Sequence, residues 1–169
     1  MIFLRHNTLR DIGIFSCIAI LCTPLMFALP AHATTKGDTT MPEFYTTPEA
    51  KAAKLPFSLA VRVGDVLHLS GALGAVPGTM NLAPGGIEAQ TKQTMENIGA
   101  VLKANGLSFD DVFKCTVMMA DMKEWPAFNA VYVTYFKPDR LPARSAFGAN
   151  GLALGAAVEM ECMAYAGAK

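Results

Sequence analysis

Two short apolar runs lie on either side of a Gly-Asp pair near residue 64. They cover residues 59–63 and 66–70 and are rich in valine and leucine, side chains that suit the pleated surface of a sheet. Glycine adopts positive φ without steric cost, so Gly64-Asp65 favours a tight turn between antiparallel strands. The pattern predicts a β-hairpin over residues 59–70.

A loop rich in proline and glycine follows at residues 75–86, and apolar positions then recur at helical spacing. The stripe predicted to be buried is Ile87, Thr91, Met95, Ile98 and Leu102. Asn105-Gly106 is a typical end for this helix. A second helix is expected at residues 125–136, where Pro126 lies in the first turn and the missing N–H costs little.

Three further strands are expected at residues 112–119, 143–147 and 157–165. The order of strand, strand, helix, strand, helix, strand, strand predicts an α+β fold with both helices on one sheet face. In the last strand Glu159 and Glu161 alternate with apolar residues and therefore share the other face. No helix is left to cover that face. A central strand with glutamates on an uncovered face is typical of a subunit interface or a binding cleft.

The first 33 residues resemble an export signal. Arg5 and Arg10 precede an apolar stretch at residues 12–29, and Ala31-His32-Ala33 places small residues at the −3 and −1 positions of a cleavage site. A permanent membrane anchor is the alternative, because the stretch is nearly long enough to span. Pro24 and the small-residue exit favour cleavage after Ala33.

We therefore expect three segments: a cleavable signal at residues 1–33, a flexible arm at residues 34–52 and one domain at residues 53–169. The arm is inferred from a segment rich in threonine, proline and glycine with little periodicity. The mature protein is expected in the periplasm or outside the cell, without stable membrane association.

Charge argues against nucleic acid as a partner. Cleavage after Ala33 would remove Arg5, Arg10 and Asp11, which leaves 136 residues with a net charge of −1. Such a balance gives no electrostatic attraction to phosphate groups or anionic lipid. The high apolar content of so short a chain instead favours burial of surface between subunits.

Two cysteines and one histidine remain after the expected cleavage, namely Cys115, Cys162 and His68. The cysteines could pair in an oxidising compartment, but cysteines within apolar strands are more often small core residues. We predict that they are unpaired. A single histidine makes a metal site of the usual His/Cys type unexpected.

Two segments near the C-terminus carry the clearest local signal: Leu141-Pro142-Ala143-Arg144-Ser145 before a strand, and Val158-Glu159-Met160-Glu161 within the last one. In these the sequence resembles the Rid/YjgF family, the reactive intermediate deaminases, whose members have a P-A-R-S segment and a later I-E-I-E-A-type strand. Other segments agree in order and spacing: Leu69-Ser70-Gly71, Glu88-Ala89-Gln90, Met95-Glu96-Asn97-Ile98, Asp111–Val117 and Phe128-Asn129-Ala130-Val131-Tyr132. The resemblance covers residues 54–164.

The resemblance implies a mixed sheet with two helices on one face, of the YjgF/chorismate-mutase-like type. It also implies a homotrimer with clefts between subunits. The implied activity is hydrolysis of reactive 2-imino acids, tautomers of enamines, to 2-keto acids and ammonia. No metal or organic cofactor is implied.

By the same resemblance, Arg144 would bind the substrate carboxylate and Glu159 would position and deprotonate the attacking water. A guanidinium can make two parallel charge-assisted hydrogen bonds to a carboxylate, which lysine cannot reproduce. An imine carbon is already electrophilic, so orientation and a modest base are sufficient. Outside this context each residue could equally form an interface ion pair. Glu161 is the weaker candidate for the base.

The sequence departs from the family at two positions of the cleft. Phe57 stands where the family often has tyrosine, and Ala146 where it often has cysteine. The aromatic wall and a backbone N–H would remain, but the hydroxyl and the thiol are lost. Ser70, with Gly71, and Asn129 are further binding candidates, although turn or helix packing explains them equally well. His68 is expected to be structural.

Two other functions stay open at this point. A non-catalytic module that binds small carboxylates in the same clefts would be consistent with the changes at Phe57 and Ala146. Cleavage of nucleic acid or inhibition of translation, suggested for some relatives, is disfavoured by the expected export and the neutral charge.

Overall fold

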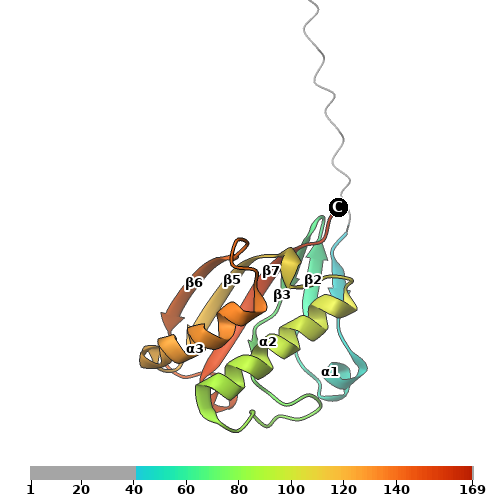
Figure 1. Ribbon diagram of the computed structural model, residues 1–169. Coiled ribbons are helices and arrows are strands. Elements are labelled where there is room, and N and C mark those ends of the chain that lie inside the picture. Colours follow the sequence, from blue (N-terminus) through green and yellow to red (C-terminus); the bar gives the residue numbers. More distant parts are fainter. Residues whose placement is uncertain (1–40, 169) are drawn as a thin grey trace, which may run out of the picture. The chain divides into compact units, whose positions relative to one another are not determined.

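The computed structural model describes residues 41–168, which form one mixed β-sheet with helices on one side (Figure 1). The strand order is β1-β2-β3-β7-β5-β6, with β4 paired to β7, and only β5 and β6 run parallel. The strands are β1 (Glu43–Tyr45), β2 (Ala60–Val63), β3 (Val66–Leu69), β4 (Ala72–Leu73), β5 (Val112–Met119), β6 (Ala143–Gly148) and β7 (Val158–Tyr165). The predicted α+β class with a mixed sheet is confirmed.

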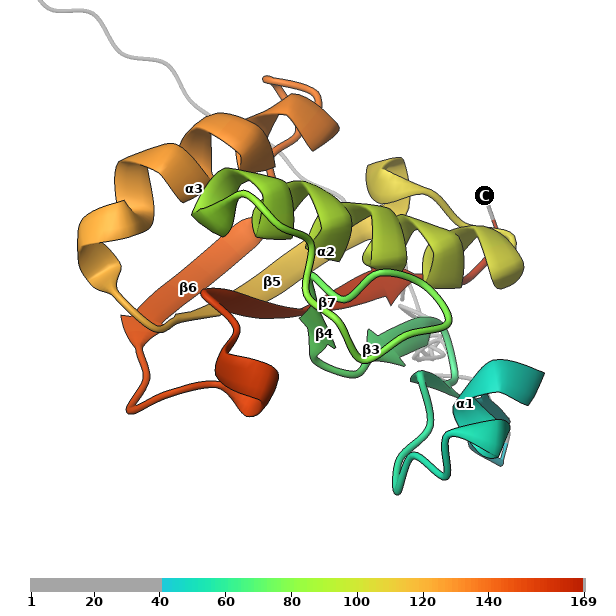
Figure 2. The same cartoon turned by 90° about the horizontal axis from the view of Figure 1, so that it is seen from below.

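Helices α2 (Gly86–Ala104) and α3 (Trp125–Tyr132) both pack on the same face of the sheet (Figure 2). The predicted stripe of α2 is buried throughout. A single core results, whose largest fully buried side chains include Leu67, Met95, Ile98, Leu102, Met119, Phe128 and Met160. The second helix is shorter than expected. Its last turn is a 3-10 helix, η3 (Val133–Tyr135), and Phe136 is already extended, so the helical geometry ends before it can reach the restriction that Pro138 imposes on Lys137.

The hairpin forms as predicted, with β2 and β3 paired from Ala60↔Leu69 to Val63↔Val66. Gly64 in the turn has φ +57°, the left-handed conformation that glycine adopts without strain. Strand β7 lies centrally, between β3 and β5, and alternates between buried and more exposed residues. Its glutamates therefore lie on the sheet face opposite α2 and α3, which neither of these two helices covers.

The N-terminal part of the described chain corrects one expectation. Residues 43–52, predicted as part of a flexible arm, contain β1 and helix α1 (Pro48–Ala52). Pairing of Phe44 with Val61 extends the sheet, and Thr47 Oγ1 accepts a hydrogen bond from Ala50 N (3.2 Å) as the helix cap. Strand pairing with a distant segment stabilises this region, and local composition does not reveal it.

The predicted signal at residues 1–33 and the first part of the arm lie outside the described residues. Within residues 41–168, no helix has the length and apolar character needed to cross a membrane.

The prediction of unpaired cysteines is wrong, because Cys115 and Cys162 form a disulfide. They are directly opposed on the adjacent antiparallel strands β5 and β7, with Cα atoms 4.1 Å apart. Both are buried, with 0% and 2% of their surface exposed. A separation of 47 residues in sequence hides this juxtaposition, which only the strand register reveals.

Reduction of this disulfide is expected to lower the free energy of unfolding by roughly 2–4 kcal/mol, because the bond closes a long loop in the unfolded chain. The midpoint of thermal unfolding should fall by on the order of 10 °C. Thermal melts with and without dithiothreitol measure the effect, and the Cys115→Ala/Cys162→Ala double variant should not respond to the reductant. An unchanged midpoint for reduced wild type would show that the bond adds nothing to stability.

Candidate active site

Arg144 projects from the edge strand β6 toward helix α3. Its guanidinium carbon lies 4.5 Å from the centroid of the Trp125 ring and 4.4 Å from that of Tyr132. Its Nη1 donates a hydrogen bond to Asn129 Oδ1 at 2.9 Å. Because the three partners lie four and three residues apart, they share one face of α3. Cation–π contacts on two rings hold the guanidinium in place and fix its orientation.

The surroundings of Arg144 contain no carboxylate partner among residues 41–168. Burial raises the pKa of Tyr132, and the positive charge of Arg144 acts in the opposite direction. The phenol therefore stays neutral at physiological pH, and the guanidinium has no anionic partner among residues 41–168. Such a group is suited to binding a carboxylate supplied from outside the chain.

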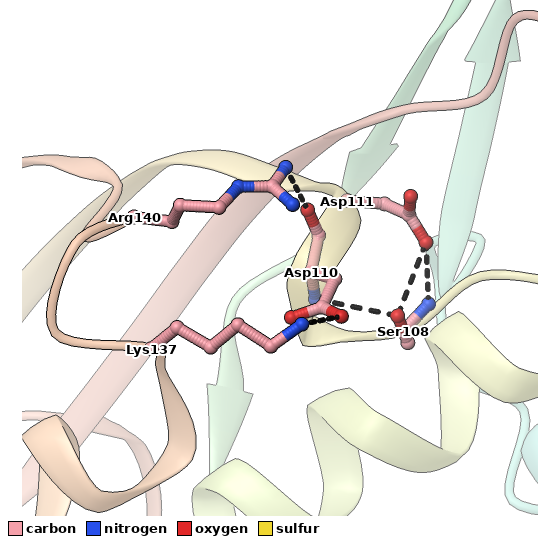
Figure 3. A network of polar contacts seen from close by, with 5 residues as sticks. All are labelled: Ser108, Asp110, Asp111, Lys137 and Arg140. Carbon is pink, nitrogen blue, oxygen red and sulfur yellow. Dashed lines mark hydrogen bonds and ion pairs between the residues drawn. The ribbon is translucent and has the colours of Figure 1, made fainter. Parts of the chain in front are cut away.

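The turn that leads into β6 is held to the start of β5 by a set of polar contacts (Figure 3). Lys137 Nζ lies 2.6 Å from Asp110 Oδ2, and Arg140 Nη2 donates to Asp110 O at 3.2 Å. Asp110 belongs to η1 (Phe109–Asp111), whose capping box pairs Ser108 with Asp111. These contacts fix the beginning of two parallel strands relative to each other, and so fix the position of Arg144 on the second.

Glu159 lies on β7, where Leu73 of β4 and Met118 of β5 are its direct neighbours. Its carboxylate packs against Gly71: a Cβ added at residue 71 would collide with Glu159 Oε1. A glycine is therefore required at position 71 because the Glu159 carboxylate approaches the backbone closely, and not because the backbone has a positive φ. The half-buried glutamate is held beside the bend that joins β3 to β4.

Two more of the predicted residues lie beside Gly71. Phe57, 49% exposed, and Ser70 line the same cavity as Gly71. Ser70 Oγ donates a hydrogen bond to Ser58 O at 2.6 Å, which fixes its side chain while leaving its lone pairs free to accept. Phe57, Ser70, Gly71 and Glu159 thus form one group of candidate residues.

The second group consists of Arg144, Asn129 and Ala146, and it lies on the other side of the sheet. Arg144 and Ala146 are opposite Cys115 and Val117 of β5, which are buried beneath the helices. Glu159 is opposite Met118, which points the other way. The two chemically essential candidates are therefore on opposite faces of one sheet, and a single chain cannot bring them to one substrate.

The arrangement can work if two copies of the chain contribute to one site. Arg144 lies on β6, which pairs with β5 alone and forms one edge of the sheet. Glu159 lies on the sheet face opposite α2 and α3. One copy would then supply a carboxylate-binding cation and the other a carboxylate base. Trp125 and Tyr132 were not among the predicted site residues and are added to the site. Their helical spacing from Asn129 was the available signal.

Comparison with known proteins identifies the family of the chain. The family model described as Endoribonuclease L-PSP matches residues 47–166. The chain is 41% identical to mouse 2-iminobutanoate/2-iminopropanoate deaminase over 122 residues, which are 72% of this chain and 90% of the mouse protein. It is 42% identical to the goat protein of the same name over 122 residues, which are 72% of this chain and 88% of the goat protein. The crystal structure of RidA from the Antarctic bacterium Psychrobacter sp. is 37% identical, with a TM-score of 0.66 over 73% of this chain and 98% of that one. The chain therefore belongs to the Rid/YjgF family.

Proposed function

We propose that this protein hydrolyses reactive 2-imino acids to 2-keto acids and ammonia in clefts shared between subunits of a homotrimer. The observation that carries the proposal is the pair of half-sites, with Arg144 ordered on one sheet face and Glu159 ordered on the other. Relatives about 40% identical are named 2-iminobutanoate/2-iminopropanoate deaminases, which supports a deaminase role for this chain.

The chemistry needs only binding, orientation and proton transfer. Arg144 of one subunit binds the substrate carboxylate through two charge-assisted hydrogen bonds. Glu159 of a neighbouring subunit takes a proton from water as the oxygen forms a bond to the imine carbon. That proton then reaches the nitrogen, which becomes an amino group on a carbon that now carries a hydroxyl. The hydroxyl proton is transferred to the nitrogen as well, the C–N bond breaks, and ammonia leaves as the C=O bond forms. Water is the only co-reactant, and nothing is oxidised or reduced.

The sheet face opposite the helices supports assembly into a trimer. It carries exposed apolar residues, such as Phe147 on β6 and Tyr165 on β7, next to Glu159 and Glu161. A sheet face of this kind is normally covered by another element or another subunit. Light scattering on the mature protein should give three times the subunit mass.

Export with cleavage after Ala33 remains part of the proposal. The disulfide between Cys115 and Cys162 supports it, since such bonds persist mainly in oxidising compartments. Intact mass spectrometry of protein recovered outside the cytoplasm should show Thr34 as the first residue. A chain that retains residues 1–33, or a lipidated cysteine, would reject this part.

A binding module for small carboxylates is the second candidate, favoured by the loss of a hydroxyl at Phe57 and of a thiol at Ala146. The test is ammonia release from imino acids that an amino-acid oxidase generates in situ. A deaminase accelerates release above the spontaneous rate in proportion to its concentration. A binding module leaves that rate unchanged while still binding pyruvate or 2-oxobutanoate in calorimetry. The net charge of −1 for residues 34–169 argues against RNA as the substrate.

A further inference from the structure

A cavity of about 770 Å³ lies beside Gly71, where the sheet separates from the N-terminal segment. The pairing of β2 with β3 ends at Ala60↔Leu69, and Ser70 N makes one more bond, to Leu59 O at 3.0 Å. Beyond this point β4 pairs with β7 and residues 55–59 take another path. The cavity fills the gap, with α2 and residues 75–80 as its other walls.

The cavity meets the site at the place where the reaction would occur. Phe57, Ser70 and Gly71 belong both to the predicted cleft and to the cavity lining. Glu159 is not itself part of the lining, but its carboxylate packs against Gly71, which is, so the proposed base lies next to the cavity wall. A substrate whose imine carbon lies at Glu159 can therefore direct its side chain into this space.

The lining is suited to an apolar group. Most of its lining surface is apolar, and the lining includes the aliphatic residues Leu55, Leu59, Leu69, Leu73, Val76, Ile98 and Val101. Its amide is already used: Asn97 Nδ2 donates to Leu73 O and Ala75 O, both at 2.9 Å, and Asn97 Oδ1 accepts from Gln93 Nε2. Ser70 Oγ is likewise committed to Ser58 O as a donor. A substituent that only accepts hydrogen bonds would lose water there without gaining donors from Asn97 or Ser70, since both are already engaged as donors.

The charge of the lining gives the same preference. Among the residues that line the cavity, Glu49 is the single charged one, and none is basic. An anionic side chain would therefore meet repulsion without a compensating cation. The volume also exceeds what a methyl or ethyl group can fill, and lies in the range of sites that enclose larger ligands.

We propose, on the basis of the function proposed above, that this cavity binds the substrate side chain and selects 2-imino acids with branched aliphatic, thioether or aromatic side chains. Leucine-derived 4-methyl-2-iminopentanoate should be hydrolysed with about tenfold or greater kcat/KM than alanine-derived 2-iminopropanoate. Each methylene removed from water is worth roughly fourfold in affinity. Even incomplete burial of the additional carbons of the leucine side chain should therefore raise kcat/KM more than about tenfold. The glutamate-derived imino acid should be the poorest substrate.

Two variants fill the cavity from exposed positions of its wall, Ala100→Trp on α2 and Ala53→Trp at the end of α1. Each is expected to reduce the ratio of leucine-derived to alanine-derived kcat/KM by fivefold or more, while hydrolysis of the alanine-derived imine stays within about twofold. Ala104→Trp, one turn further along α2 on an exposed position outside the lining, is the matched control and should keep the wild-type ratio. Circular dichroism and thermal melts check folding of all three.

Calorimetry with 4-methyl-2-oxopentanoate and pyruvate separates this inference from the proposed function. If wild type hydrolyses both imines equally and Ala100→Trp and Ala53→Trp match the control, the cavity does not select substrates, although the deaminase function stands. If no imine is hydrolysed but the larger keto acid binds at least tenfold more tightly, and the tryptophan variants abolish that preference, the cavity assignment stands and the deaminase function fails. Equal binding without hydrolysis overturns both.

Discussion

Replacement of Glu159 by glutamine is expected to lower kcat for imine hydrolysis by about 10²–10⁴-fold, the usual contribution of a positioned general base. Glutamine preserves the size of the side chain and its packing against Gly71, but it cannot accept the proton of the attacking water. Affinity for pyruvate or 2-oxobutanoate should stay within about threefold, because binding depends mainly on Arg144. Ammonia release gives kcat, and calorimetry gives the affinity.

Glu161 supplies a matched control, because it lies two residues further along β7 on the same sheet face. Glu161→Gln should leave kcat within about threefold of wild type. Gly71→Ala keeps every charged group but places a methyl group where the Glu159 carboxylate lies, so it should lower kcat while the chain still folds. Equal losses for Glu159→Gln and Glu161→Gln would assign the effect to the charge of the face and not to a base.

Arg144→Lys is expected to damage binding more than turnover. The substitution replaces a planar fork, held between Trp125 and Tyr132, by a single ammonium group. Loss of a charged hydrogen bond typically costs roughly 1.5–3 kcal/mol, which corresponds to a rise of about 10- to 150-fold in the Kd of pyruvate or 2-oxobutanoate. Calorimetry measures the Kd directly, and KM for the imino acid should rise in parallel.

Arg140→Lys is the corresponding control. Arg140 donates to the backbone of Asp110 in the turn before β6 and does not contact Arg144. Its replacement should change the Kd by less than about threefold. If Arg144→Lys binds keto acids as wild type does, the guanidinium is not the carboxylate anchor and its contacts with α3 are structural.

Much of the fold was predictable because its signals are local. The turn at Gly64-Asp65, the stripe from Ile87 to Leu102 and the alternation around Glu159 each depend on neighbouring residues. Strand β1 and the disulfide were missed for the opposite reason. Pairing of Phe44 with Val61 and of Cys115 with Cys162 depends on which strands become neighbours, and strand order is not encoded in local periodicity.

The site shows the same division. The sequence pointed to Arg144, Glu159, Phe57, Ser70, Gly71, Asn129 and Ala146, and the structure sorts these residues into two groups. The sequence alone could not show that Arg144 and Glu159 lie on opposite faces, because their faces depend on which residues of β5 stand opposite each of them. The contacts of Arg144 with Trp125 and Tyr132 depend on how α3 packs over β6, which is also a property of tertiary structure.

Subunit mixing tests the central claim most directly. Arg144→Lys and Glu159→Gln chains carrying different affinity tags would be co-expressed, and assemblies that contain both would be isolated by sequential purification. In a trimer that contains both variants, about one of the three clefts combines an intact Arg144 from one subunit with an intact Glu159 from the next. Ammonia release from in situ generated imino acid should then rise to about one third of the wild-type rate, far above either parent variant. Mixed assemblies no more active than the average of the two parents would contradict a site shared between subunits.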